Sequence, residues 1–368
     1  MYLLLLTACM FGPGFRFHEN HGHERPRDTG DTGDIDDTGV VDTAVETGDT
    51  SDTSDTSDTS DTGDTSDTSG TWPPAGGAVI AWGAGGLYAS DGDGLAFSQL
   101  TDVPPDGVNV GDGAVSARVG DTVTAYDVAT GAATVSFTFA CPNGGVLTDA
   151  ILVTGAAYGI CEDSLGARVA LGAFDGSTTD TGVWADALQW DQGALYLIED
   201  WGREGGQIFA VDPMALNATG AVANVGFSPE ARGDGFFSSF GELGNDTAGG
   251  FMVGSWADVA TIASTVLPDG EFVNAVDVLH GQASLVDARA WPGLAPSGLL
   301  LDAEGAVAVS LPGCSTPRLV SRESGYVEGW CTGPLTRTTW STDAWATVET
   351  QSFADLDVAH LRVVETGD

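Results

Sequence analysis

Short runs in which apolar and polar residues alternate recur along the chain and predict β-strands. Residues 134–139 alternate strictly, which is typical of a strand with one buried face. They follow another strand-like run, 122–128, across a turn at 129–131, so the two runs predict a hairpin. A second hairpin is predicted from residues 299–302 and 306–311.

Shorter runs at 207–211 and 251–253 add strands, and no long stretch has the periodicity of an amphipathic helix. The chain contains 52 glycines, which favour frequent tight turns. Many short strands joined by turns are typical of a β-sandwich, a β-barrel or a β-propeller. We therefore expect an all-β domain.

A different pattern fills residues 28–69, where Asp-Thr-Gly and Asp-Thr-Ser triplets repeat without a basic residue. Almost no apolar side chain is present to offset the entropy of ordering this segment, and its like charges repel one another. The composition changes at 70–74, around Trp72. We expect a disordered acidic linker over 9–71 and a globular domain over 72–368, preceded by a signal peptide at 1–8.

The charge of the chain is strongly negative. A net charge of -41 arises from 53 acidic and 12 basic residues, and all of the basic residues are arginine. Such a surface repels nucleic acid and anionic lipid headgroups. We expect no nucleic-acid partner and no cofactor.

The N-terminus resembles a bacterial lipoprotein signal. An apolar run ends in Leu6-Thr7-Ala8-Cys9, which fits a lipobox, although the run is short and no basic residue precedes it. The resemblance implies cleavage before Cys9 and acylation of its sulfur. We then expect the protein in the cell envelope, anchored by lipid outside the cytoplasm, with the outer membrane favoured.

The remaining four cysteines fall into two closely spaced pairs, Cys141 with Cys161 and Cys314 with Cys331. An even number of cysteines in an exported chain favours disulfides. Their spacing is not that of a zinc site, because no C-x-x-C motif or neighbouring histidine accompanies them. The sequence predicts these two bridges, with four buried thiols as the alternative.

One stretch, 232–258, orders its residues as a known repeat does. Phe236, Ser238 and Ser239 precede a turn-forming segment at 241–250, and 251–254 add an apolar strand that ends in glycine. This order resembles one unit of the FG-GAP family, the β-propeller repeats of integrin α-chain heads and many bacterial surface proteins. Fainter copies lie at 149–156 and 168–173, and 193–198 resembles the strand that follows in the family's unit.

In the FG-GAP family the acidic loop holds calcium, which takes six to eight oxygen ligands. Here Glu242 and Asp246 keep two acidic positions, whereas Gly244 and Gly250 replace two others. The resemblance implies a weak calcium candidate at Glu242 and Asp246, and a metal-free turn is the alternative that we favour.

The resemblance and the domain size together favour a β-propeller with six or seven blades, and tandem β-sandwiches are the alternative. Residues 78–82 are expected to pair with a last strand near 358–364 and so close the ring. Nine tryptophans follow Trp72, and we expect most of them to pack between blades.

Signatures of catalysis are scarce, and we predict that the protein is not an enzyme. After the linker the only histidines are His280 and His360, and no nucleophile elbow, zinc-protease motif, P-loop or dinucleotide fingerprint is present. Arg232-Gly233-Asp234 spells an integrin-recognition tripeptide, for which a pre-strand turn is the better explanation. The acidic residues of 91–94 are likewise expected in a hairpin turn.

These observations favour a surface-anchored lipoprotein whose propeller acts as a binding, adhesion or scaffold module. Its partner would be a cell-surface protein or a polysaccharide. An extracytoplasmic propeller hydrolase or lyase acting on polysaccharide is the alternative, and a structural envelope protein without a specific ligand is a third.

Overall fold

The computed structural model describes residues 77–364 except 93, 112, 129, 165–167, 175–176, 192, 201–204, 213–217, 226, 233–234, 241–248, 257, 268–270, 291–294 and 322–324. Within them the chain forms strands β1 to β28 and a single short 3-10 helix, η1 (Pro142–Gly144). The prediction of an all-β domain is confirmed.

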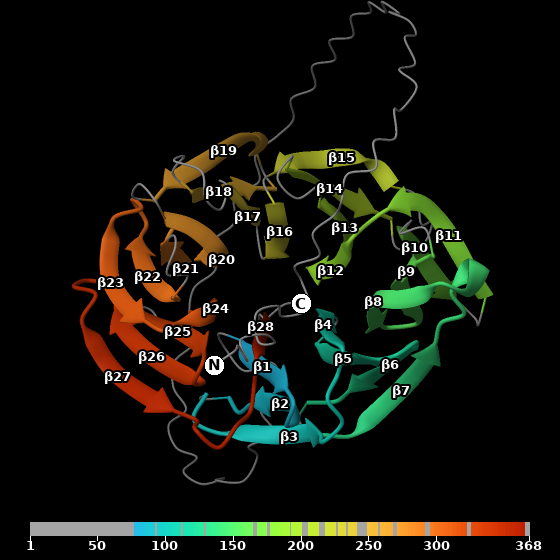
Figure 1. Cartoon of the computed structure of the whole chain (residues 1–368), viewed down its shortest axis with the longest axis horizontal. Helices are drawn as coiled ribbons and strands as arrows, with labels where there is room; N and C mark the ends of the chain where they lie inside the picture. The colour runs from blue at the N-terminus through green and yellow to red at the C-terminus, as the bar shows by residue number, and fades with distance from the viewer. Residues whose placement is uncertain are drawn as a thin grey trace, which may run out of the picture. The chain divides into compact units, whose positions relative to one another are not determined.

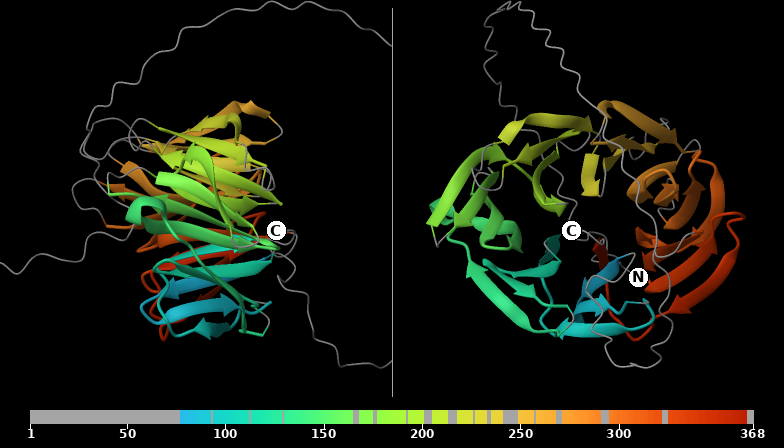
Figure 2. Two further views of the ribbon diagram at one scale, coloured as in Figure 1. Left: turned by 90° about the vertical axis from the view of Figure 1, so that its right-hand side faces the viewer. Right: turned by 180° about the vertical axis from the view of Figure 1, so that it is seen from behind.

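The described strands form seven four-stranded sheets, called blades 1 to 7 here, and every paired strand is antiparallel to its neighbour. Blades 2 to 7 each take four consecutive strands, from β4–β7 to β24–β27. The blades are arranged around a common axis, and in blades 2 to 7 the first strand is innermost and the last lies at the rim (Figure 1). In the edge-on view of Figure 2 the sheets of adjacent blades lie next to one another around the ring.

In chain order the strands are β1 (Ala78–Gly83), β2 (Gly86–Ser90), β3 (Phe97–Thr101), β4 (Gly107–Gly111), β5 (Ala114–Val119), β6 (Thr122–Tyr126), β7 (Ala133–Thr138), β8 (Val146–Val153), β9 (Ala156–Glu162), β10 (Arg168–Phe174), β11 (Ser177–Trp184), β12 (Ala187–Asp191), β13 (Ala194–Asp200), β14 (Gly206–Val211), β15 (Ala218–Val225), β16 (Phe227–Arg232), β17 (Gly235–Phe240), β18 (Gly250–Ser255), β19 (Asp258–Val266), β20 (Glu271–Leu279), β21 (Ala283–Ala290), β22 (Ser297–Asp302), β23 (Val307–Pro312), β24 (Ser315–Val320), β25 (Tyr326–Thr332), β26 (Thr336–Ser341), β27 (Thr347–Ser352) and β28 (His360–Val364).

Blade 1 closes the ring with strands from both ends of the described chain. Its order is β28-β1-β2-β3, so the last strand supplies the innermost position and β1 pairs with it from Ala78 opposite Val364 to Trp82 opposite His360. The predicted pairing of these two segments is confirmed. The order also decides between the two architectures, because a ring of sheets is a propeller and not a pair of sandwiches, and seven sheets fix the blade number.

The apolar core lies between adjacent blades. Ile80 and Leu87 of blade 1 pack with Val108 and Val115 of blade 2, and the equivalent clusters recur around the ring. Each blade buries both of its faces against its neighbours, so no blade is stable alone. Trp340 is buried between blades 6 and 7, as expected of most tryptophans.

Both predicted hairpins are present, as β6–β7 and as β22–β23. The predicted buried face of residues 134–139 is present in part. Phe137 is half-buried and Phe139 is fully buried in the core cluster between blades 2 and 3, whereas Val135 on the same face is exposed. The other face of β7 is open, because β7 is the outermost strand of blade 2. On that face threonine and serine hydroxyls pair with those of β6, including Thr124 with Ser136 at 2.9 Å.

The two predicted disulfides, Cys141–Cys161 and Cys314–Cys331, are present, with Cα–Cα distances of 5.5 and 5.0 Å. They occupy the same place in two blades. In each, a cysteine ahead of the innermost strand is joined to one near the end of the second strand. Each bridge therefore links the segment that leads into a blade's innermost strand to the second strand of the same blade.

Candidate functional site

A polar residue recurs on the innermost strands. In six of the seven innermost strands a polar residue lies two positions before the last residue of the strand. In the seventh, β8, that position is Ile151. The six residues are Asn109, Gln189, Glu230, Asp277, Arg318 and Arg362. We call these six residues together with Asp149 of β8 the inner polar ring.

The inner polar ring connects neighbouring blades. Arg362 of blade 1 donates to the side-chain oxygen of Asn109 in blade 2. The Asn109 amide donates in turn to Asp149 at 2.7 Å and to the carbonyl of Ala150 at 3.0 Å, both in blade 3. Asp149 accepts the backbone N–H of Leu188 in blade 4 at 3.0 Å. These contacts join four consecutive blades at their inner edges.

The other side of the ring is joined in the same way. Asp277 of blade 6 accepts the backbone N–H of Leu319 in blade 7. Arg318 of blade 7 donates to the carbonyl of Leu361 in blade 1 at 3.0 Å and forms an ion pair of 3.3 Å with Glu230 of blade 5. The carboxylates of Asp149, Asp277 and Glu230 thus accept hydrogen bonds or form ion pairs with groups on other blades. This arrangement indicates a structural role in joining the blades.

The charges at the inner edge perturb one another. Burial raises the pKa of Asp149, and the N–H of Leu188, the charge of Arg362 and the amide of Asn109 partly oppose this rise. Burial lowers the pKa of Arg362, with opposing contributions from Glu230 and Asp149. His360 lies at the start of the same strand, where burial and then Arg318 lower its pKa. Its ring stacks on that of Trp82, with the ring centroids 5.2 Å apart.

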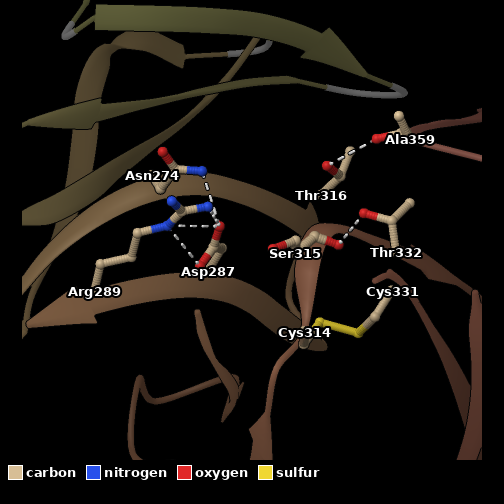
Figure 3. A network of polar contacts seen from close by, with 9 residues as sticks. All are labelled: Asn274, Asp287, Arg289, Cys314, Ser315, Thr316, Cys331, Thr332 and Ala359. Carbon is tan, nitrogen blue, oxygen red and sulfur yellow. Dashed lines mark hydrogen bonds and ion pairs between the residues drawn. A yellow bond between two sulfur atoms is a disulfide. The ribbon is translucent and has the colours of Figure 1, made fainter. Parts of the chain in front are cut away.

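A second polar network lies within blade 6 (Figure 3). Asp287 of β21 is completely buried and accepts hydrogen bonds from Asn274 at 2.8 Å and from the guanidinium of Arg289 at 2.8 Å. Burial raises the pKa of Asp287, although Arg289 and Asn274 oppose it. In the same view Thr332 donates to the carbonyl of Ser315 beside the Cys314–Cys331 bridge. The network joins β20 to β21, and the Asp287 side chain is inaccessible to solvent.

A groove that opens to solvent lies on one face of the ring, between blades 6 and 7, which are orange to red in Figure 1. Its volume is about 500 Å³. Turns after the first and third strands of a blade lie at the same end, because successive strands are antiparallel. Such turns from both blades line the groove, and its lining includes Gln282, Asp302, Glu304, Ser321, Thr342 and Trp345.

Two features fix the walls of this groove. The Oδ1 atom of Asp302 accepts the backbone N–H groups of Glu304 at 3.1 Å and Ala306 at 2.8 Å, which holds the β22–β23 turn rigid. Trp345 packs partly against the core cluster of blades 6 and 7 and has a φ of 51°. A bulky residue in this left-handed region is strained, and such strain is found where a side chain must be held in a particular place.

The residues of the FG-GAP-like stretch that the structure describes are structural. Phe236 of β17 lies directly opposite Gly254 of β18, and a Cβ on Gly254 would come within 2.2 Å of the Phe236 ring. The calcium candidates Glu242 and Asp246 lie outside the described residues, as does Cys9. The two fainter copies occupy the first and the third strand of blade 3, so they do not mark equivalent positions. Residues 194–198, which resemble the family's following strand, belong to the second strand of blade 4.

Other predicted features take ordinary places. Asp91 caps the β2–β3 turn by accepting the N–H of Leu95 at 2.8 Å, which agrees with the expected hairpin turn. Arg232 ends β16, while Gly233 and Asp234 lie outside the described residues. Among the residues that the structure describes, no cluster of three or more histidine, cysteine or acidic side chains is placed to hold a metal ion. Over the same residues, no helix is long and apolar enough to span a membrane.

Sequence reasoning missed both the inner polar ring and the groove. The ring had a local signal, a single polar residue inside a short apolar run, as in Gly-Val-Asn-Val-Gly around Asn109 and Val-Asp-Val-Leu around Asp277. The groove had none, because its residues come from four turns that are far apart in the sequence.

No protein-family model matches the chain, and no curated protein matches it. Among solved structures it is similar to Kuenenia stuttgartiensis hydrazine synthase, with 14% identity, 66% of this chain and 78% of that chain covered, and a TM-score of 0.47. It is also similar to the Cps50 (Swd1) β-propeller domain of Myceliophteria thermophila, with 10% identity, 74% and 99% covered, and a TM-score of 0.47. Similarities at this level carry no information on ligand or activity.

Proposed function

We propose that the protein is a surface-anchored lipoprotein whose propeller acts as a binding or scaffold module in the cell envelope. Lipid on Cys9 would hold the chain at the membrane, and the acidic segment up to residue 71 would carry the propeller, residues 72–368, away from it. The FG-GAP-like unit at 232–258 is part of this proposal, because that resemblance points to surface propellers that bind partners.

The observation that carries the proposal is the groove between blades 6 and 7. Among the described residues, the side chains of Gln282 and Thr342 make no hydrogen bond, and both line the groove next to Trp345. Polar groups without partners beside an aromatic ring are what a binding surface presents to a ligand. The charged side chains of the inner polar ring instead make hydrogen bonds and ion pairs with other blades.

The anchor is tested separately from binding. We expect mass spectrometry of the membrane-extracted protein to find an acylated N-terminal Cys9 and the Cys9→Ser variant to leave the membrane fraction. An intact, unmodified Met1 would contradict the lipoprotein part of the proposal.

Binding is tested with the full chain carrying Cys9→Ser, so that retention on isolated envelopes cannot come from the lipid. We expect this protein to be retained and its Trp345→Ala version to be lost. Trp184→Ala is the matched control, because Trp184 is 57% exposed at the end of β11 in blade 3, away from the groove. No retention, or equal loss in both variants, would contradict a binding function located in the groove.

A further inference from the structure

We infer that the groove between blades 6 and 7 binds a neutral oligosaccharide, such as a stretch of an uncharged surface polysaccharide. The inference deepens the proposed binding function and rests on it. It concerns the chemical class of the ligand, which follows from the volume, charge and hydrogen-bonding groups of the groove.

The volume of about 500 Å³ lies within the range of small-ligand sites, roughly 300–1,000 Å³. Its lining is mostly polar, whereas sites for apolar ligands are lined mainly by apolar side chains. A ligand that suits it therefore has many hydroxyl groups and some apolar surface. A short run of sugar rings has both, because its hydroxyls lie around the edge and its C–H groups on the ring faces.

The hydrogen-bonding groups of the groove match such a ligand. Gln282 offers an amide that both donates and accepts, and Ser321 and Thr342 offer hydroxyls that do the same. Within the described part of the chain, none of these three side chains has a hydrogen-bond partner. The carboxylate of Glu304 and the Oδ2 atom of Asp302 add acceptors, since Oδ1 of Asp302 already accepts two backbone N–H groups. Vicinal hydroxyls can donate to the two oxygens of the Glu304 carboxylate.

Trp345 supplies the apolar surface. One part of its side chain packs against the core of blades 6 and 7, and its position in the groove leaves the rest for a ligand. Its strained backbone, with φ at 51°, holds the ring at the end of the β26–β27 turn. An aromatic ring fixed at the wall of a polar groove is a platform on which a sugar face can stack.

Charge excludes the anionic members of the same class. The charged residues among the described lining of the groove, Asp302 and Glu304, are both acidic, and the whole chain carries a net charge of -41. A polyuronate or a phosphate-bearing polymer would be repelled by this surface. A basic peptide would be attracted, but the uncharged donors and acceptors of Gln282, Ser321 and Thr342 would then have no special role.

The experiment measures binding of the full chain carrying Cys9→Ser to defined probes by affinity electrophoresis and calorimetry. The probes are neutral glucans, mannans, galactans and xylans, a polygalacturonate, and an oligolysine peptide. We expect at least one neutral glycan to bind. Trp345→Ala should weaken this binding about tenfold or more and Gln282→Ala about threefold, consistent with the loss of one aromatic contact and one hydrogen bond.

Two controls separate recognition from folding. Trp345→Phe keeps an aromatic face and should restore most of the affinity, and Trp184→Ala should bind as the parent chain does. Gln282 is exposed, so Gln282→Ala tests the groove without disturbing the core. Thermal unfolding of each variant would show whether weaker binding follows from a damaged fold.

Three results would overturn the inference: no binding to any neutral glycan, preferred binding of polygalacturonate or of oligolysine, or glycan binding that Trp345→Ala leaves unchanged. Failure here together with Trp345-dependent retention on envelopes would leave the binding function in place and reject only the ligand class. Failure of both experiments would reject the function itself.

Discussion

Single glycines of the propeller lie directly against aromatic rings, and this contact decides which side chains they tolerate. A Cβ on Gly329 of β25 would lie 2.5 Å from the ring of Trp340, which is fully buried and has no room to move. A Cβ on Gly107 of β4 would meet only the side chain of Arg118, at 3.6 Å. The absence of a side chain is therefore required at the first position and not at the second.

We expect Gly329→Ala to lower the free energy of unfolding by about 1–3 kcal/mol, because the added methyl group overpacks the contact between blades 6 and 7. Gly107→Ala is the matched control and should leave stability unchanged or raise it slightly, since alanine restricts the unfolded chain. Denaturant unfolding of the two variants measures both effects. Equal stability of the two variants would contradict this account of the Gly329–Trp340 contact.

Also at the residue scale, Asp149 makes stability depend on pH. Burial raises its pKa above the ordinary value of 3.8, so the folded protein binds a proton more tightly than the unfolded chain does. The stability that Asp149 contributes is then fully present below pH 3.8 and is lost as the pH rises through its higher folded-state pKa.

The Asp149→Asn variant cannot titrate at this position. We expect it to be less stable overall, because the asparagine amide opposes the donors of Asn109 and Leu188. The advantage of the parent protein over the variant should shrink as the pH rises from about 4 towards neutrality. Thermal unfolding over this range measures the difference, and a constant difference would show that Asp149 keeps its ordinary pKa.

At the scale of the element, the innermost strands are held at two places. The inner polar ring links the innermost strands of blades 6, 7, 1, 2 and 3 each to the next blade, and in blades 3 and 7 a disulfide links the segment ahead of the strand to the second strand. The sideways links are short-range contacts in the folded state. The disulfides act differently, because they restrict the unfolded chain.

Replacing Cys141 and Cys161 together with serine should lower the free energy of unfolding by about 3 kcal/mol, the loop-closure value for a bridge of this span. The corresponding change at Cys314 and Cys331 should have a similar effect, because the two bridges occupy equivalent places. Denaturant unfolding with and without reductant gives the measurement. If thiol titration of the denatured, unreduced protein finds four reactive thiols, the bridges do not form in the protein.

At the scale of the whole molecule, stability depends on closure. β28 is the innermost strand of blade 1, and its residues Leu361 and Val364 are buried against blades 7 and 2. Without this strand blade 1 would present an open inner edge, and the cores on both of its sides would lose a wall. Because blades pack only against their neighbours, an opening at one place weakens the whole ring.

A chain that stops after residue 357, and so lacks β28, should therefore lose cooperative unfolding and become sensitive to limited proteolysis. A chain that stops after residue 364 keeps the closing strand and should unfold as the full protein does. Circular dichroism melting and protease digestion compare the two truncations. Cooperative melting of the shorter chain would show that the ring does not need its closing strand.

The predicted hairpins, turns and cysteine pairs could be recognised in the amino-acid sequence, since each of them depends on residues that are close together in the chain. The alternation of 299–311, the acidic turn at Asp91 and the spacing of Cys314 and Cys331 are local properties. The closure of the ring was also predictable, because an apolar strand at each end of a propeller needs a partner. The alternation of 134–139 predicted its buried face only in part, since a hydrophobic pattern does not show how much of an edge strand a neighbouring blade covers.

Only the tertiary structure decided the number of blades, the inner polar ring and the groove. Arg318 and Glu230 form an ion pair although they are 88 positions apart in the sequence, and Gln282 of blade 6 and Trp345 of blade 7 line the same groove. Such contacts follow from how the blades are placed around the axis, and no local pattern of residues encodes that placement. A site built from turns of different blades therefore becomes visible only when the ring is closed.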